Sequence, residues 1–127
     1  MIRWFLSSMS LVVTLMSGGV AVANPHSSIR RYTCEDLTAC PKPLSDPKSW
    51  IANDDYIGPR ENISSVRFAI VVGPKGEVQS CLIESSSGSA AFDRAMYNGV
   101  CKHASFLPVQ DNYQRPATGK VVLIVWP

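Results

Sequence analysis

The chain lacks the charge excess and the metal-binding spacings that would point to several common functions. Its 12 basic and 10 acidic residues leave a net charge of only +2, so neither nucleic acid nor an anionic membrane is expected as a partner. It has only two histidines, and no two of its cysteines show the C-x2-C spacing of zinc sites. The sequence therefore predicts no bound metal and no other cofactor.

Sequence patterns of nucleophilic catalysis are also missing. The serine-rich stretch at residues 85–89 lacks the G-x-S-x-G pattern in which hydrolases present a catalytic serine, and helix capping explains it. No acidic residue is placed by the sequence to orient His103 as a general base. We therefore expect no catalytic residues and no enzymatic activity.

The first 23 residues have the pattern of a secretory signal peptide. A single basic residue, Arg3, precedes an apolar stretch over residues 4–22, and the pattern closes on Ala21-Val22-Ala23. The sequence predicts cleavage before Asn24 and a working compartment outside the cytoplasm. The alternative is an uncleaved membrane anchor, because the stretch is nearly long enough to cross a bilayer of ~30 Å. The serines and glycines inside the stretch favour cleavage.

All four cysteines lie after the expected cleavage site, in a part of the chain whose length suits one domain. An even number of cysteines in a small exported chain is typical of disulfides, and four cysteines allow three pairings. The close spacing of Cys34 and Cys40 favours a bridge that closes a short loop. Cys81 and Cys101 then remain as the second pair.

Residues 24–49 predict an extended, proline-rich leader that is fixed only by its cysteine loop, because no apolar period runs through them. The domain itself is expected over residues 50–127. Its first part carries Trp50 and Tyr56, but Gly58-Pro59 allows only a short helix there.

The clearest secondary structure starts at Ser65. Apolar residues alternate over residues 65–72, which predicts a strand. Residues 73–76 have turn chemistry and lead into a return strand at 77–84, so the two strands form a hairpin. Residues 120–126 predict a third strand that is apolar on both faces.

A helix is predicted between the second and third strands. Ser89 is placed to cap its first free amides, and Asp93 lies in the early turns, where the helix dipole favours a negative charge. One apolar face follows from the helical spacing of six residues: Phe92, Ala95, Met96, Gly99, Val100 and His103.

These elements predict an α+β fold in which one helix covers a three-stranded antiparallel sheet of order 2-1-3. A right-handed crossover through the helix places the third strand beside the first. Because the third strand is apolar on both faces, the second face of the sheet also needs cover. Trp50 and Tyr56 could supply that cover, or a partner could.

From Trp50 to Trp126 the chain resembles the C-terminal domain of TonB, in the form found in small TonB-family periplasmic proteins. The most specific similarity lies in ESSSGSAAFD at residues 84–93 and FLPV at residues 106–109. Asp55-Tyr56 and the alternation from Val66 to Ile70 before the turn also match. This chain departs from the family at Ile57, where the family has proline.

A second departure concerns the helix cysteine. Relatives with a cysteine in the second strand often carry the helix cysteine one turn earlier, at the position of Tyr97 here. Cys101 lies four residues further along, on much the same side of the helix, so a bridge to Cys81 stays feasible.

The resemblance implies a protein-binding module in the periplasm, anchored in the inner membrane if the signal peptide is not cleaved. In that family the domain pairs an exposed strand edge with an extended segment of an outer-membrane transporter, as part of TonB-dependent transport. In the 2-1-3 order the third strand has an unpaired edge, so the expected partner-binding residues are Lys120, Val121, Val122, Leu123, Ile124, Val125 and Trp126.

Other partners and functions stay open. A second copy of the chain could pair along the same edge and form a homodimer. With the signal peptide cleaved, the module would lack the membrane anchor of an energy transducer. The alternative interpretation is a disulfide-stabilised exported protein with an unrelated binding or self-association function.

Overall fold

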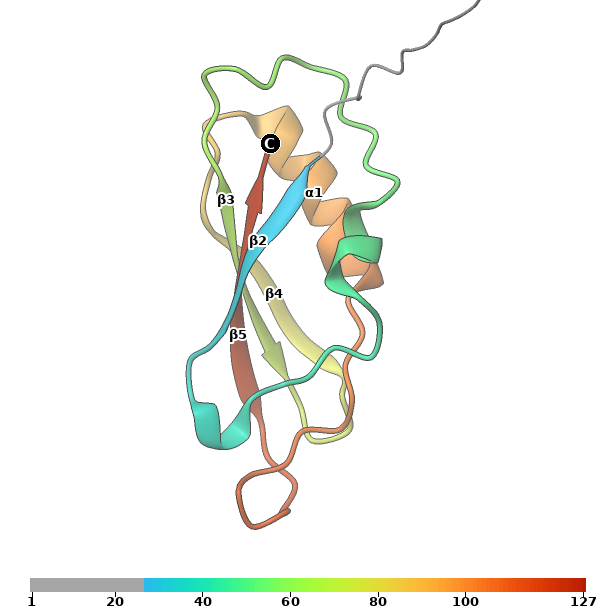
Figure 1. The fold of residues 1–127 in the computed structure, drawn as a ribbon, viewed down its shortest axis with the longest axis vertical. Coiled ribbons are helices and arrows are strands. Elements are labelled where there is room, and N and C mark those ends of the chain that lie inside the picture. Colours follow the sequence, from blue (N-terminus) through green and yellow to red (C-terminus); the bar gives the residue numbers. More distant parts are fainter. Residues whose placement is uncertain (1–26) are drawn as a thin grey trace, which may run out of the picture.

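The computed structural model describes residues 27–127, in which one α-helix packs against an antiparallel sheet of four strands (Figure 1). The strands are β2 (Ser28–Cys34), β3 (Val66–Val72), β4 (Val78–Ser85) and β5 (Gly119–Trp126), and their order in the sheet is β2-β5-β3-β4. The predicted signal peptide, residues 1–23, lies outside the described residues.

The predicted hairpin, helix and last strand are confirmed. β3 pairs with β4 on one side and with β5 on the other. The hairpin turn needs Gly76, which adopts a left-handed φ of 83° and donates its N–H to the carbonyl of Gly73 at 2.9 Å. The helix α1 (Ala90–His103) is capped by Ser89, whose hydroxyl accepts the N–H of Phe92 at 3.1 Å.

The prediction of three strands is wrong, because part of the predicted leader forms a fourth strand. β2 pairs antiparallel with β5, from Ser28 opposite Trp126 to Cys34 opposite Val121. Residues 28–34 therefore belong to the folded domain. The extended leader that we expected over residues 24–49 is, in its described part, a strand followed by the cysteine loop and two 3-10 helices, η2 (Leu37–Ala39) and η3 (Pro47–Ile51).

The hydrophobic core lies between the sheet and α1. Alternate side chains of β3 and β5 point into it, as the period of two requires. Burying each such side chain stabilises the fold by ~1.5–3 kcal/mol. The fully buried residues at its centre are Val66, Phe68, Ile70, Val72, Phe92, Met96, Val100, Val121, Leu123 and Val125.

Trp50 and Tyr56 both pack on the helix side of the sheet. Trp50 is only 3% exposed and meets the ring of Phe106 edge-on, with the ring centroids 5.5 Å apart. Tyr56 meets Phe92 in the same way at 5.2 Å. The suggestion that these two residues cover the second face of the sheet is therefore wrong. In Figure 1, α1 and η3 lie on the same side of the sheet, whereas η2 lies at the lower end of the sheet, away from α1.

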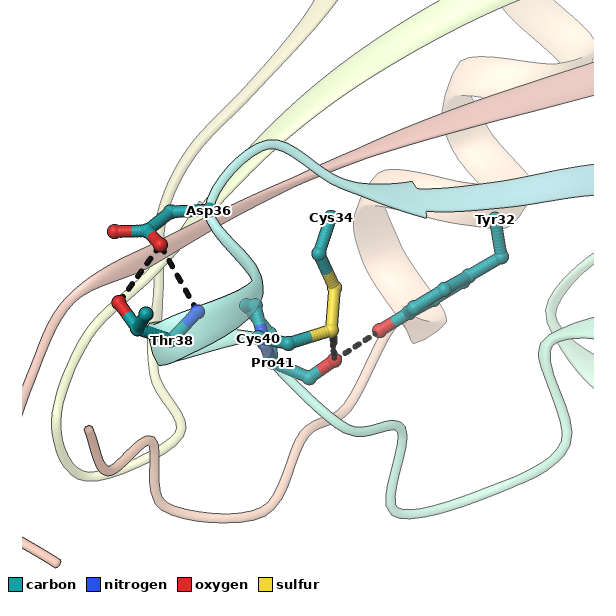
Figure 2. Close-up of a disulfide and its surroundings, with 6 residues drawn as sticks. All are labelled: Tyr32, Cys34, Asp36, Thr38, Cys40 and Pro41. Atoms are coloured by element: carbon teal, nitrogen blue, oxygen red, sulfur yellow. Dashed lines mark hydrogen bonds between the residues drawn. A yellow bond between two sulfur atoms is a disulfide. The ribbon is translucent and has the colours of Figure 1, made fainter. Parts of the chain in front are cut away.

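Both predicted disulfides are confirmed. Cys34 and Cys40 have Cα atoms 5.3 Å apart and close the loop that contains η2 (Figure 2), and Cys81 and Cys101 have Cα atoms 5.8 Å apart and join β4 to α1. Disulfides are typical of an oxidising compartment outside the cytoplasm. Within residues 27–127, no helix has the length and apolar character needed to cross a membrane.

Candidate partner-binding site

The predicted partner-binding strand, β5, lies in the interior of the sheet. Leu123, for example, is paired with Phe68 of β3 on one side and with Tyr32 of β2 on the other. The expectation that the third strand has an unpaired edge is therefore wrong. Of the seven predicted residues, three are fully buried in the core: Val121, Leu123 and Val125. The other four lie on the second face, where Lys120, Val122 and Ile124 are half-buried and Trp126 is exposed.

The strand that fills the edge of β5 is only lightly buried. Among the seven residues of β2, only Cys34 is buried, while Ile29 and Tyr32 are half-buried against the core. Arg30, Arg31 and Thr33 are exposed. Backbone pairing, more than side-chain packing, therefore holds β2 in its place.

The C-terminal end of β2 is firmly anchored. Its last residue, Cys34, carries the disulfide, and the hydroxyl of Tyr32 donates to the carbonyl of Pro41 at 2.7 Å (Figure 2). Burial raises the pKa of Tyr32 to about 12. Just beyond the strand, Glu35 donates its N–H to the carbonyl of Lys120 at 3.0 Å and forms an ion pair with the Lys120 ammonium at 3.2 Å.

The N-terminal end of β2 is held by fewer contacts. The Arg60 guanidinium donates to the hydroxyl of Ser27 at 2.8 Å. A hollow of about 300 Å³ lies beside the first residues of the strand, lined by Ser27, Ser28, Ile29, Lys48, Ile51 and Ala52. The packing under β2 is therefore incomplete at the end that has no disulfide.

Both outer edges of the sheet carry features that oppose pairing with another chain. In β2 the register shifts between Ile29 and Arg31, which makes a bulge at Arg30. In β4 the register shifts at Gln79 and again at Glu84. Bulges and charged residues on an edge strand are known means of preventing strand addition.

The serine-rich segment forms the N-terminal cap of α1. Ser87 is buried and donates both its N–H, at 3.0 Å, and its hydroxyl, at 2.6 Å, to Asp93, and Ser86 donates its hydroxyl to the same carboxylate. Burial raises the pKa of Asp93, but these hydrogen bonds outweigh it and hold the pKa below the ordinary value of 3.8. The only described histidine, His103, lies at the opposite end of α1, roughly 20 Å away by helix rise.

The imidazole of His103 is engaged by its own helix, because its Nδ1 lies 2.9 Å from the carbonyl oxygen of Gly99. Residues 27–127 also contain no group of three or more His, Cys, Asp or Glu side chains placed to hold a metal ion.

Comparison with known proteins gives no relative: no family model, curated protein or solved structure matches the chain. The fold and the site define a small disulfide-linked α+β protein whose interior strand β5 is paired with a lightly buried outer strand.

Proposed function

We propose that this chain is a periplasmic protein-binding module of the TonB type, which pairs an extended segment of another protein with β5. The observation that supports the proposal is that the edge of β5 already takes up an extended segment, namely β2. Strand addition supplies backbone hydrogen bonds that contribute ~0.5–1.5 kcal/mol each and selects side chains at alternate positions. In this proposal the partner segment takes the place of β2.

The exchange is energetically feasible because β2 buries little. A partner strand replaces the backbone hydrogen bonds of β2 with its own, so the main losses are the burial of Ile29 and Tyr32 and the hydrogen bond from the Tyr32 hydroxyl to Pro41. Full burial of one large apolar side chain contributes ~1.5–3 kcal/mol, so two half-buried side chains together contribute a similar amount. A partner with apolar residues at the two matching positions offsets that loss.

The contacts at its two ends determine which end of β2 leaves β5 first. The disulfide holds the Cys34 end, whereas the Ser28 end has weaker contacts and a hollow beside it. We therefore expect β2 to leave β5 from Ser28 onward, which opens the edge at Trp126 first. The outer edges of β2 and β4 are poorer sites for a partner, because bulges interrupt both strands.

The resemblance to TonB suggests the class of partner, an N-terminal segment of an outer-membrane transporter. Cleavage before Asn24 would separate the module from its membrane segment, so we propose binding without a membrane motor of its own. The two disulfides support a site of action in an oxidising compartment such as the periplasm.

The test uses the exported chain with synthetic peptides that copy the N-terminal segments of transporters encoded in the same genome. Binding should leave the backbone amides of residues 120–126 protected from hydrogen exchange, because the partner replaces the hydrogen bonds of β2, and should release those of residues 28–33. If none of these segments binds, the chain is not a module of the TonB type. The alternative function, self-association, predicts instead that the fraction of dimer rises with protein concentration.

A pair of engineered disulfides locates the binding edge. Thr33 and Val122 are paired across β2 and β5 on the second face, so T33C with V122C should lock β2 in place and abolish peptide binding. The matched control is V71C with S80C, which ties β3 to β4 and leaves the edge of β5 untouched. Equal peptide binding by both stapled proteins would show that the partner does not bind at β5.

A further inference from the structure

The second face of the sheet is open and partly apolar. It presents a stripe along β5 formed by Val122, Ile124 and Trp126, of which Trp126 is 40% exposed. Beside the stripe, Ala69 of β3 pairs with both Val122 and Leu82; Ala69 is only 5% exposed between its neighbours, whereas Leu82 is 60% exposed. We call these five residues, Ala69, Leu82, Val122, Ile124 and Trp126, the open sheet face.

Three arginines border the open sheet face. Ile124 is paired with Arg31 of β2 on one side and with Arg67 of β3 on the other, so both arginines lie on its face. The bulge in β2 turns Arg30 toward the end of the stripe, where its guanidinium carbon lies 5.1 Å from the centre of the Trp126 ring. The apolar stripe is therefore framed by positive charge.

The acidic residues near this face are already paired. Glu84 accepts from the guanidinium of Arg67 at 2.9 Å and lies 3.8 Å from the ammonium of Lys120. Glu35 also pairs with Lys120, at 3.2 Å. Among the described residues, Arg30 and Arg31 have no acidic partner within ion-pair distance, so their charges are uncompensated on this face.

We propose that the open sheet face binds an acidic, partly apolar segment of another protein. Carboxylates of that segment pair with Arg30 and Arg31, and its apolar side chains cover Ile124 and Leu82. Arginine suits this task because its planar guanidinium forms two parallel hydrogen bonds with one carboxylate. The proposal concerns a face of the sheet, so it does not rest on strand exchange at the edge of β5.

Charge complementarity selects this occupant over a second copy of the chain. A two-fold dimer through this face would pack two copies of the same positively charged patch against each other. Like charges that meet at an interface without partners weaken binding. An acidic segment instead neutralises them, and its association should weaken with added salt.

The experiment uses the exported chain and a synthetic peptide of alternating glutamate and leucine, with an equally long lysine and leucine peptide as the control. Binding is measured by NMR titration, with the indole N–H of Trp126 and the amides of residues 67–69, 81–83 and 120–126, on the three strands that form the open sheet face, as reporters. We expect the acidic peptide alone to bind, with shifts centred on these residues. The double variant R30E/R31E should lower its affinity by about tenfold or more.

The matched control variant is R94E, which reverses an exposed arginine on α1, on the other side of the sheet. It should leave the affinity for the acidic peptide unchanged. Equal loss in R94E and R30E/R31E, or shifts centred on α1, would overturn the proposal. So would binding to phosphatidylglycerol vesicles without binding of the acidic peptide, or a concentration-dependent dimer that covers Trp126.

Discussion

Cys81 of β4 and Cys101 of α1 are joined by a disulfide that fixes the outer strand of the sheet to the helix. The bridge closes a loop with a sequence separation of 20 residues. Replacing both cysteines with serine should lower the free energy of unfolding by about 3 kcal/mol, because the unfolded chain gains the freedom that the loop removes. Urea unfolding measures this loss.

The second disulfide serves as the comparison. Cys34 and Cys40 have a sequence separation of only 6, so their replacement should cost less, about 2 kcal/mol. An unchanged urea midpoint in the Cys81 and Cys101 double variant would contradict the prediction. If the Cys34 and Cys40 double variant were unfolded while the Cys81 and Cys101 double variant kept the natural urea midpoint, the short loop, and not the bridge to the helix, would hold the domain together.

The elements that follow a regular period could be predicted from the sequence, and β2 could not. In residues 66–72 every second side chain, from Val66 to Val72, is fully buried in the core, and α1 has a regular apolar face with its cap at Ser89. In β2 the bulge at Arg30 places Ile29 and Tyr32 in the core three positions apart, so the alternation is lost. Pairing with β5, a contact distant in sequence, makes this segment a strand.

The same limit applies to the site. The residues of β5 could be identified as a strand, but whether its edge is free depends on where β2 lies. The sides taken by Trp50 and Tyr56 depend on their contacts with Phe106 and Phe92, which the sequence pattern does not encode. The positions of Arg31 and Arg67 on either side of Ile124 likewise follow only from the register of the three strands.

The cap of α1 gives a prediction on pH. The pKa of Asp93 lies below its ordinary value of 3.8, so its contribution to stability is present above that value and is lost as the pH falls through the lower pKa of the folded state. D93N should therefore lower the free energy of unfolding by about 1 kcal/mol at neutral pH. The difference from the natural chain should shrink in strongly acidic solution.

Urea unfolding of both proteins across the acidic range checks this. S105A, which alters an exposed hydrogen bond between Ser45 and Ser105 away from the cap, is the control and should keep the natural pH dependence. A difference between D93N and the natural chain that stays constant with pH would show that the charge of Asp93 does not stabilise the cap.

Tyr32 reports whether β2 is docked. Burial raises its pKa from 10.0 to about 12, so the stability this site contributes is present below about pH 10 and is lost as the pH rises toward about 12. When a partner segment displaces β2, Tyr32 becomes exposed and its pKa should fall back toward the ordinary value. NMR of the ring at about pH 10 to 11, with a tyrosine-free peptide, follows this change.

The variant Y32F identifies which NMR signal belongs to the ring of Tyr32. The control is the protein with the engineered disulfide between T33C and V122C. In the stapled protein the peptide should leave the titration of Tyr32 unchanged, because β2 cannot leave. A peptide that binds the natural chain without altering the Tyr32 titration would show that β2 stays in place when the partner is bound.

The two proposed sites should oppose each other, because Arg30 and Arg31 belong to β2 itself. A segment that takes the place of β2 at the edge of β5 carries these arginines away from the open sheet face. Conversely, an acidic segment on that face ties β2 to the sheet through them. Each ligand should therefore lower the affinity for the other by the same factor, about fivefold or more, since coupling between two sites is reciprocal. Titration of a transporter peptide with and without the glutamate and leucine peptide measures that factor.

In R30E/R31E the coupling should vanish while the transporter peptide still binds, because its site on β5 is unchanged. Independent binding of both peptides to the natural chain would mean that β2 stays on β5 in the complex, and the exchange would then be excluded as the mode of binding.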